Sequence, residues 1–213
     1  MNYLEEKFKI QWQYSGCTGD YKKGFVEIVK QYQKPKRYYH TFGGHIKFCV
    51  KAFFDYAVFQ VSDPVALMWQ LLLHDSVMDF ERSDNDIASA LWAKKYLCKF
   101  GASQAVAEKV ANAITYHTHQ SIPDSEDIKF GLDIDLLILA QSEQIFDEYE
   151  CNIRKEYSFV PESVFCQKRS EILQSFLNNR PSIFLTDYFK QRFEINARKN
   201  LEMSIKKLKR NIT

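Results

Sequence analysis

The sequence predicts an all-α fold, and three features carry this prediction. Glycine and proline are scarce, with seven and five among 213 residues, so turn signals are too few for many short strands. Apolar side chains recur at intervals of three and four residues, which is the period of an amphipathic helix. No segment shows the apolar–polar alternation of a half-buried strand of useful length. We therefore expect about eight or nine helices.

The composition limits the class of protein. An apolar fraction of 46%, with 15% aromatic residues, is enough for a packed core and excludes a disordered chain. The net charge of +2 argues against general nucleic-acid binding, which usually needs a concentrated basic surplus. The five cysteines are scattered and form no CxxC pair, which indicates reduced thiols and argues against a disulfide framework or a zinc knuckle.

Two further features predict a cytoplasmic protein with no membrane partner. Residues 1–13 mix charged and aromatic side chains and lack the apolar stretch of a signal peptide. The most apolar windows, around residues 71–73 and 136–139, are too short to span a bilayer.

The first three helices follow from amphipathic spacing. We expect one over residues 4–14 and a second over residues 22–32, which ends because the residue before Pro35 is pushed out of the helical region. Gly43-Gly44 opens the next helix. Its inward stripe has i, i+3, i+4, i+7 spacing and consists of Ile46, Cys49, Val50, Phe53 and Ala57.

Capping residues place the boundaries of the middle helices. Asp63-Pro64 combines a capping carboxylate with proline at the first helical position. A helix from about Asp84 to Phe100 stops at Gly101, and Ser103 caps another, whose inner face ends in His117.

One central helix is expected after the turn at residues 121–124. Its apolar stripe runs from Ile128 to Tyr149 in alternating steps of four and three, and Asp135 interrupts it. Pro161 and Thr186 begin the last two helices.

Two acids and one histidine stand where apolar residues would be expected. His74-Asp75 directly follows three leucines, and Asp135 lies in the apolar central helix. A buried carboxylate must be protonated, paired or bound to a metal. Imidazole and carboxylate together suit a transition metal. The alternatives are a histidine satisfied within the core and a surface position for Asp133 or Asp135.

Longer motifs give a resemblance to a known family. The segments Tyr39-His40…His45-Ile46, Leu73–Val77 and Asp133–Leu136 look like the H…HD…D signature of the HD superfamily. The C-terminal half is similar to bacterial predicted metal-dependent HD phosphohydrolases, and the resemblance extends from about Trp12 to Ile205. Its residues there are Arg154–Tyr157, Val160-Pro161, Arg169, Phe176-Leu177, Glu194, Ala197-Arg198 and Asn200-Leu201.

The resemblance implies a metal site and a hydrolytic reaction. His45 would be the first ligand, His74 and Asp75 the paired ligands, and Asp135 the last, preferred to Asp133. The cofactor would be a divalent manganese, iron, cobalt, nickel, zinc or magnesium ion. The resemblance further implies an HD-type helical bundle in a single domain over residues 1–213, with a core at about 35–150 and packed C-terminal helices at about 151–210.

The implied reaction is attack of metal-activated water on a small phosphorylated substrate, with nucleotides the usual substrates of the superfamily. Asp79, or one of His117 and His119, would orient the water or move its proton, with Asp75 also at the reacting centre. A second metal would need His40, His117 or His119 as a ligand. The candidate phosphate-binding residues are Lys36, Arg37, Arg154, Arg169 and Arg198, with Arg37 preferred for its place in a loop before His45.

Three other functions stay open at this point. A non-catalytic sensor could bind a nucleotide or metal on the HD scaffold, although retention of all four ligand types argues against it. An HD-fold diiron oxygenase would use the additional histidines. A purely structural helical protein is the third, and the absence of an internal repeat argues against it.

Overall fold

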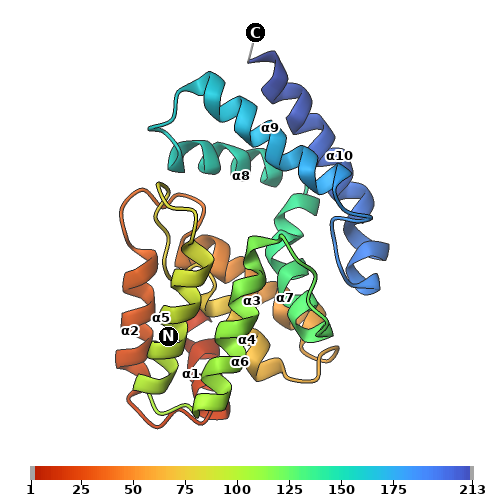
Figure 1. Ribbon diagram of the computed structural model, residues 1–213. Helices are drawn as coiled ribbons and strands as arrows, with labels where there is room; N and C mark the ends of the chain where they lie inside the picture. The colour runs from red at the N-terminus through yellow and green to blue at the C-terminus, as the bar shows by residue number, and fades with distance from the viewer. Residues whose placement is uncertain (1–2, 212–213) are drawn as a thin grey trace. The chain divides into compact units, whose positions relative to one another are not determined.

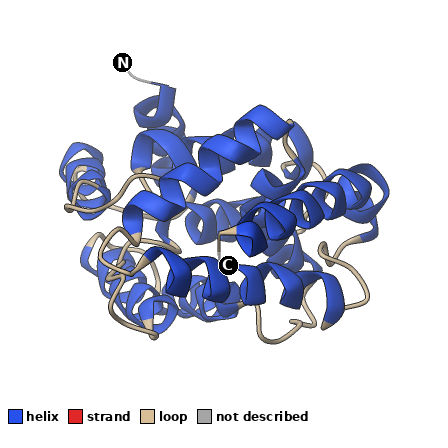
Figure 2. Ribbon diagram, turned by 90° about the horizontal axis from the view of Figure 1, so that it is seen from above, coloured by secondary structure: helices blue, strands red, loops and turns tan. Residues whose placement is uncertain are grey.

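A computed structural model describes residues 3–211, and every regular element in that range is a helix (Figure 2). The prediction of an all-α fold is confirmed. The described chain contains ten α-helices and four short π or 3₁₀ turns, more than the eight or nine helices expected. It divides into two compact units between Leu132 and Asp133, while the single-domain expectation stays a prediction. None of the helices described has both the length and the apolar character needed to cross a bilayer.

The first unit contains the helices labelled α1 to α6 in Figure 1 and most of α7. Helices α5 and α6 pack against each other, and α4 packs against α1, α3, α5 and α6. The α-helices are Tyr3–Tyr14 (α1), Tyr21–Tyr32 (α2), Lys47–Ala52 (α3), Pro64–Leu73 (α4), Asn85–Lys99 (α5), Gln104–Thr115 (α6) and Glu126–Leu136 (α7). The short turns are Phe42–Ile46 (η1), Phe53–Ala57 (η2) and Tyr116–Thr118 (η3).

Helix α4 is the centre of the first unit. All its residues from Ala66 to Leu73 are buried, which fits its nearly continuous apolar sequence. The Trp69 ring lies 5.6 Å from that of Phe8 and 6.3 Å from that of Trp12, centroid to centroid, so aromatic packing joins α4 to α1. This core fixes the helix whose C-terminal end carries His74.

Several predicted capping residues are confirmed. Caps depend on a few neighbouring residues, so they can be predicted from the local sequence. The side chain of Asp63 accepts a hydrogen bond from the Ala66 N–H, and that of Ser103 accepts one from Val106. Gly101 has φ +87°, as expected for the residue that ends α5. The predicted inward stripe of Ile46, Cys49, Val50, Phe53 and Ala57 is buried throughout.

The expected uninterrupted helix from Ile128 to Tyr149 is wrong. Helix α7 ends at Leu136, a 3₁₀ turn covers Leu137–Ala140 (η4), and α8 begins at Glu143. The Asn200 side-chain amide donates to the carbonyls of Leu139 and Gln141, at 2.9 and 2.8 Å. This contact replaces helical hydrogen bonding at the break, and Gln141 takes an extended conformation.

The second unit contains the end of α7, the turn η4 and three further helices, Glu143–Glu156 (α8), Glu162–Asn178 (α9) and Asp187–Arg210 (α10). Helix α10 packs against α9 and against η4. Pro161 and Thr186 are the residues before α9 and α10, as predicted, and the Thr186 side chain accepts a hydrogen bond from the Phe189 N–H.

Candidate metal centre

His45 lies in a π-helical turn that the helical period did not predict. The turn η1 is capped by Thr41, whose hydroxyl accepts a hydrogen bond from the Gly44 N–H at 3.1 Å. A side chain at Gly44 would come 2.7 Å from that hydroxyl, so glycine is needed for the cap. Isolated π turns are frequent at functional sites, and here one carries a buried histidine that is 2% exposed.

His74 is the residue at which α4 ends, and a backbone contact determines its tautomer. Its Nδ1 lies 3.1 Å from the Leu71 carbonyl oxygen. Because a carbonyl oxygen only accepts hydrogen bonds, Nδ1 carries the proton. The Nε2 atom of neutral His74 therefore has a lone pair for a proton or a metal. A backbone carbonyl on the second nitrogen is one of the usual partners of a metal-binding histidine.

Three potential ligand atoms converge in the first unit. His45 Nε2 lies 3.0 Å from His74 Nε2, and Asp75 Oδ2 lies 3.1 Å from His74 Nε2 and 3.4 Å from His45 Nε2. Atoms bound about 2.1 Å from one ion, at adjacent octahedral or tetrahedral positions, lie about 3.0–3.4 Å apart. The two nitrogens and one carboxylate oxygen therefore have the spacing and the chemistry to hold one divalent transition metal.

The charge of Asp75 depends on the surrounding imidazoles. Burial raises the pKa of its carboxyl group, whereas the imidazoles of His74, His40 and His45 lower it by more, so the net pKa lies well below the usual value. The side chain of Asp75 is therefore a carboxylate, which is the form that binds a cation.

His117 lies beside this cluster and His119 is farther along the chain. The His117 ring stacks on the His74 ring at 4.4 Å between centroids, with 22° between the planes. Its Nε2 lies 3.1 Å from the side-chain nitrogen of Gln70. His119 has φ +54°, and its ring centroid is 6.0 Å from that of His117. The structure thus places His117 directly against a proposed ligand.

Arg37 is buried and connects the two motif segments. Its guanidinium donates to the carbonyl oxygens of His40 and Ser76, at 3.0 and 3.3 Å, and lies 4.9 Å from the centroid of the Tyr32 ring. His40 belongs to the segment that leads to His45, and Ser76 follows Asp75. Arg37 remains a predicted phosphate ligand, and these contacts give it a supporting role as well.

Lys36 and Asp79 are two further predicted residues of the first unit, and both are on its surface. Lys36 has φ +69° and forms an exposed ion pair with Glu81 at 3.6 Å. Asp79 is exposed in the loop after the HD pair, and its carboxylate accepts a hydrogen bond from the Glu81 N–H at 3.0 Å.

Asp133 and Asp135 have different environments. Asp133 is fully buried, and its carboxylate accepts three hydrogen bonds of 2.6–2.8 Å, from the Leu185 N–H and from the N–H and hydroxyl of Thr186. These contacts hold the start of α10 within the second unit. Asp135 is partly exposed and lies in the last turn of α7.

The three predicted arginines of the second unit all pair with carboxylates. Arg154 donates to Glu162 at 2.7 Å, Arg169 pairs with Glu150, and Arg198 donates to Glu194 at 2.7 Å. Arg169 also donates to the Tyr149 hydroxyl at 2.7 Å and is largely buried. A phosphate at any of them would have to share the guanidinium with that carboxylate.

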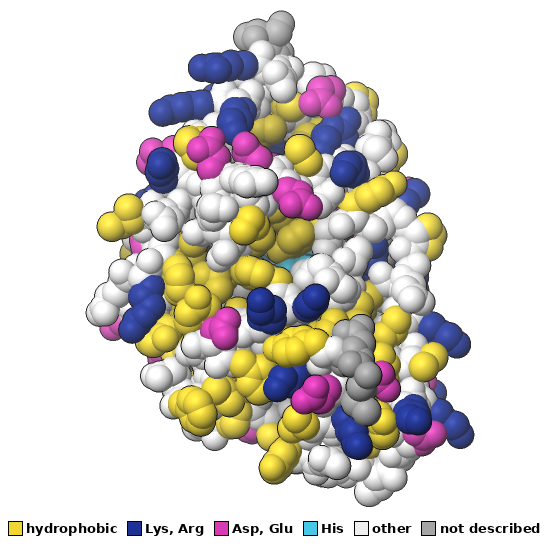
Figure 3. Space-filling model, turned by 180° about the vertical axis from the view of Figure 1, so that it is seen from behind, with side chains coloured by type: hydrophobic (Ala, Val, Ile, Leu, Met, Phe, Trp, Pro, Cys, Tyr) yellow, Lys and Arg dark blue, Asp and Glu magenta, His cyan; other side chains and the backbone are white. Residues whose placement is uncertain are grey.

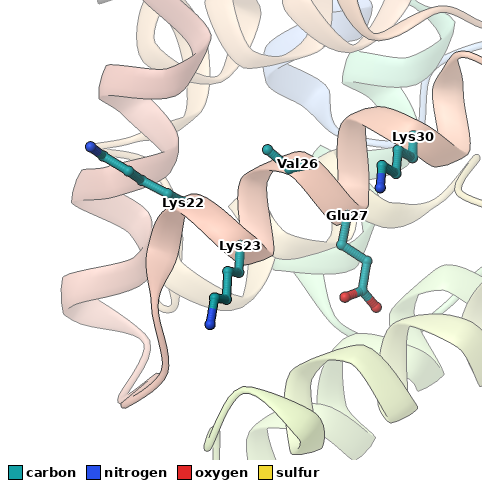
Figure 4. Close-up of a pocket in the computed structure, with 5 residues that line it drawn as sticks. All are labelled: Lys22, Lys23, Val26, Glu27 and Lys30. Atoms are coloured by element: carbon teal, nitrogen blue, oxygen red, sulfur yellow. The ribbon is translucent and has the colours of Figure 1, made fainter.

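On the face drawn in Figure 3, histidine contributes only a small area set back among apolar side chains. The hollow in Figure 4 is a different feature, lined along α2 by Lys22, Lys23, Val26, Glu27 and Lys30. Its Glu27 pairs with Lys99 at 2.6 Å, and no proposed ligand lines it.

Gln70 and Gly131 were not predicted from the sequence as part of the site. Gln70 is a buried polar residue one helical turn before His74, and a side chain at Gly131 would overlap its amide. The signal for Gln70 was its place in the otherwise apolar segment of α4.

The chain matches no protein-family model, no curated protein and no solved structure.

Proposed function

We propose that this protein is a metal-dependent phosphohydrolase of the HD type. The observation that carries the proposal is the spacing of His45 Nε2, His74 Nε2 and Asp75 Oδ2, which are 3.0–3.4 Å apart. Asp135 is the proposed fourth ligand, and the order His45, His74-Asp75, Asp135 follows the resemblance to HD phosphohydrolases.

Helical periodicity supports Asp135 over Asp133. Asp135 follows Gly131 by four residues in the continuous helix α7, so both lie on one face of that helix. Gly131 is where α7 approaches Gln70, one turn before His74 in α4. Asp133 points from another face, and its carboxylate is already used by Leu185 and Thr186.

The protein side chains have separate roles in the proposed reaction. When bound, a divalent cation supplies Lewis-acid activation of water and of a phosphoryl oxygen. The low pKa of Asp75 keeps its carboxyl group ionised, and the Nδ1–H of His74, which donates to the Leu71 carbonyl, leaves Nε2 as the ligand atom of the neutral ring. Asp79 or His119 is the proposed acceptor of the proton from the attacking water, because the Nε2 atom of His117 already contacts the side-chain nitrogen of Gln70.

The proposed substrate is a small phosphorylated metabolite such as a nucleotide. Lys36 and Arg37 precede the first ligand, and their positive charge would stabilise the charge that develops on the phosphate. The Lys36 side chain is 60% exposed and can reach for a ligand, whereas Arg37 is held by backbone carbonyls.

The experiment is metal analysis followed by a phosphate-release screen across nucleotides, cyclic nucleotides and phosphate esters. We expect about one transition metal per chain and phosphate release that a chelator abolishes. His74→Ala and Asp75→Ala should lose both properties but keep the helical circular-dichroism spectrum. Asp124→Ala, at an exposed acid outside the cluster, is the matched control and should keep both. Phosphate release by a metal-free variant would contradict the proposal.

A further inference from the structure

We propose that Gln70, with Gly131 behind it, positions the imidazole of His117 against His74 and so fixes the orientation of a metal ligand. The inference rests on the metal centre proposed above. It assigns His117 to the support of that centre and makes Gln70 and Gly131 necessary for it. All four residues belong to the first unit.

The His74 ring is restrained on one edge and on one face. The Leu71 carbonyl accepts from Nδ1 at 3.1 Å, and the His117 ring covers one face at 4.4 Å between centroids. The hydrogen bond alone allows the ring to tilt about it. A nearly parallel ring with 22° between the planes limits that tilt and keeps Nε2 directed at His45 and Asp75.

His117 is held by the side-chain amide of Gln70. The two Nε2 atoms lie 3.1 Å apart, and Gln70 is 1% exposed. Because an amide nitrogen only donates hydrogen bonds, His117 Nε2 is the acceptor. The lone pair on that atom is therefore engaged by Gln70, and His117 acts through its stacked ring.

Gly131 leaves room for the Gln70 amide. A Cβ atom at this buried position would come 2.6 Å from Gln70 Cδ and 2.7 Å from Oε1, which is closer than real contacts allow. The atoms that would have to move are the flexible end of Gln70. Gly131→Ala should therefore displace the amide from His117 more than it disturbs the fold.

The test uses Co²⁺ alone as the probe and measures its dissociation constant and visible absorption spectrum. We expect His117→Ala, Gln70→Leu and Gly131→Ala each to weaken Co²⁺ binding by about tenfold and to change the spectrum. His117→Phe keeps a stacked ring, so its affinity should recover to within about twofold of the unaltered protein. In the His117→Phe background, Gln70→Leu should have no further effect, since the hydrogen bond is already absent.

The outcomes separate this inference from the proposed function. If the unaltered protein binds no Co²⁺, the metal centre itself is overturned. If it binds Co²⁺ but Gln70→Leu and Gly131→Ala bind equally well, the positioning role fails and the centre stands. If His117→Phe binds as weakly as His117→Ala, His117 is a direct ligand and the inference is overturned. Thermal unfolding of each metal-free variant checks the fold. If His117→Ala does not fold, the Co²⁺ affinities of Gln70→Leu and His117→Phe, each compared with the unaltered protein, still decide whether the positioning role holds.

Discussion

The carboxylate of Asp133 caps the start of α10 by accepting hydrogen bonds from Thr186, at 2.8 Å from its backbone N–H and 2.7 Å from its hydroxyl. Asp133 and the proposed ligand Asp135 are two residues apart in the same helix, but only Asp133 is fully buried. The two acids can therefore be separated by experiment.

Asp133→Ala should destabilise the protein without removing its metal. It leaves buried N–H groups at the start of α10 without their acceptor, at a cost of about 2–4 kcal/mol. Asp135→Ala should have the opposite pattern, with metal affinity lost and stability of the metal-free protein nearly unchanged. Urea unfolding and metal titration of the two variants provide the measurement. Loss of metal in the folded Asp133 variant, with retention in the Asp135 variant, would reverse the assignment.

Two adjacent glycines test the π turn before His45. Gly44→Ala places a Cβ atom 2.7 Å from the Thr41 hydroxyl and should break that cap, at about 1 kcal/mol. Gly43→Ala is the matched control, because a Cβ there meets no atom within 4 Å. We expect metal affinity to fall for Gly44→Ala only, as measured by titration with Mn²⁺. Equal affinities would show that the cap does not position His45.

Arg37 can support the site, bind the substrate, or do both. Arg37→Lys cannot donate to the carbonyls of His40 and Ser76 in the same planar geometry, so metal affinity and stability should both fall. A residue that only binds phosphate would raise the Michaelis constant and leave metal affinity unchanged. Lys36→Ala, next to it but exposed, should show that second pattern. Steady-state kinetics with metal titration of both variants distinguish the roles.

Arg169 should be the most important of the C-terminal arginines for stability. Its removal leaves Glu150 largely buried without its partner, which costs about 3–5 kcal/mol. Lys168→Ala, which removes an exposed ion pair with Glu171, is the control and should cost less than about 1 kcal/mol. Chemical denaturation measures both. Equal stability of the two variants would show that the buried Arg169 pair contributes no more than the exposed Lys168 pair.

Local features of the fold could be predicted from the sequence, whereas long-range ones could not. The cap at Asp63 and the glycine at the end of α5 depend on a few neighbouring residues. The break after Leu136 depends on Asn200, whose side chain binds carbonyls 59 and 61 residues earlier. The helical spacing of apolar residues over 128–149 therefore does not predict the break.

The candidate site likewise has local features that the sequence predicted and long-range features that it did not. The placement of His74-Asp75 after three leucines predicted a buried histidine and acid, and both are buried. The stacking of His117 on His74 and the contact of Gln70 with Gly131 join different helices. Only tertiary packing could reveal them.

Anomalous diffraction from crystals grown with Mn²⁺ or Co²⁺ tests the metal centre most directly. The proposed metal centre requires one strong anomalous peak about 2.0–2.2 Å from His45 Nε2, His74 Nε2 and an Asp75 carboxylate oxygen. The alternative is a cluster without metal, in which the Nε2–H of His45 donates to His74 Nε2 across their 3.0 Å separation. Crystals that contain the metal elsewhere, with these three side chains joined only by hydrogen bonds, would contradict the proposed metal centre.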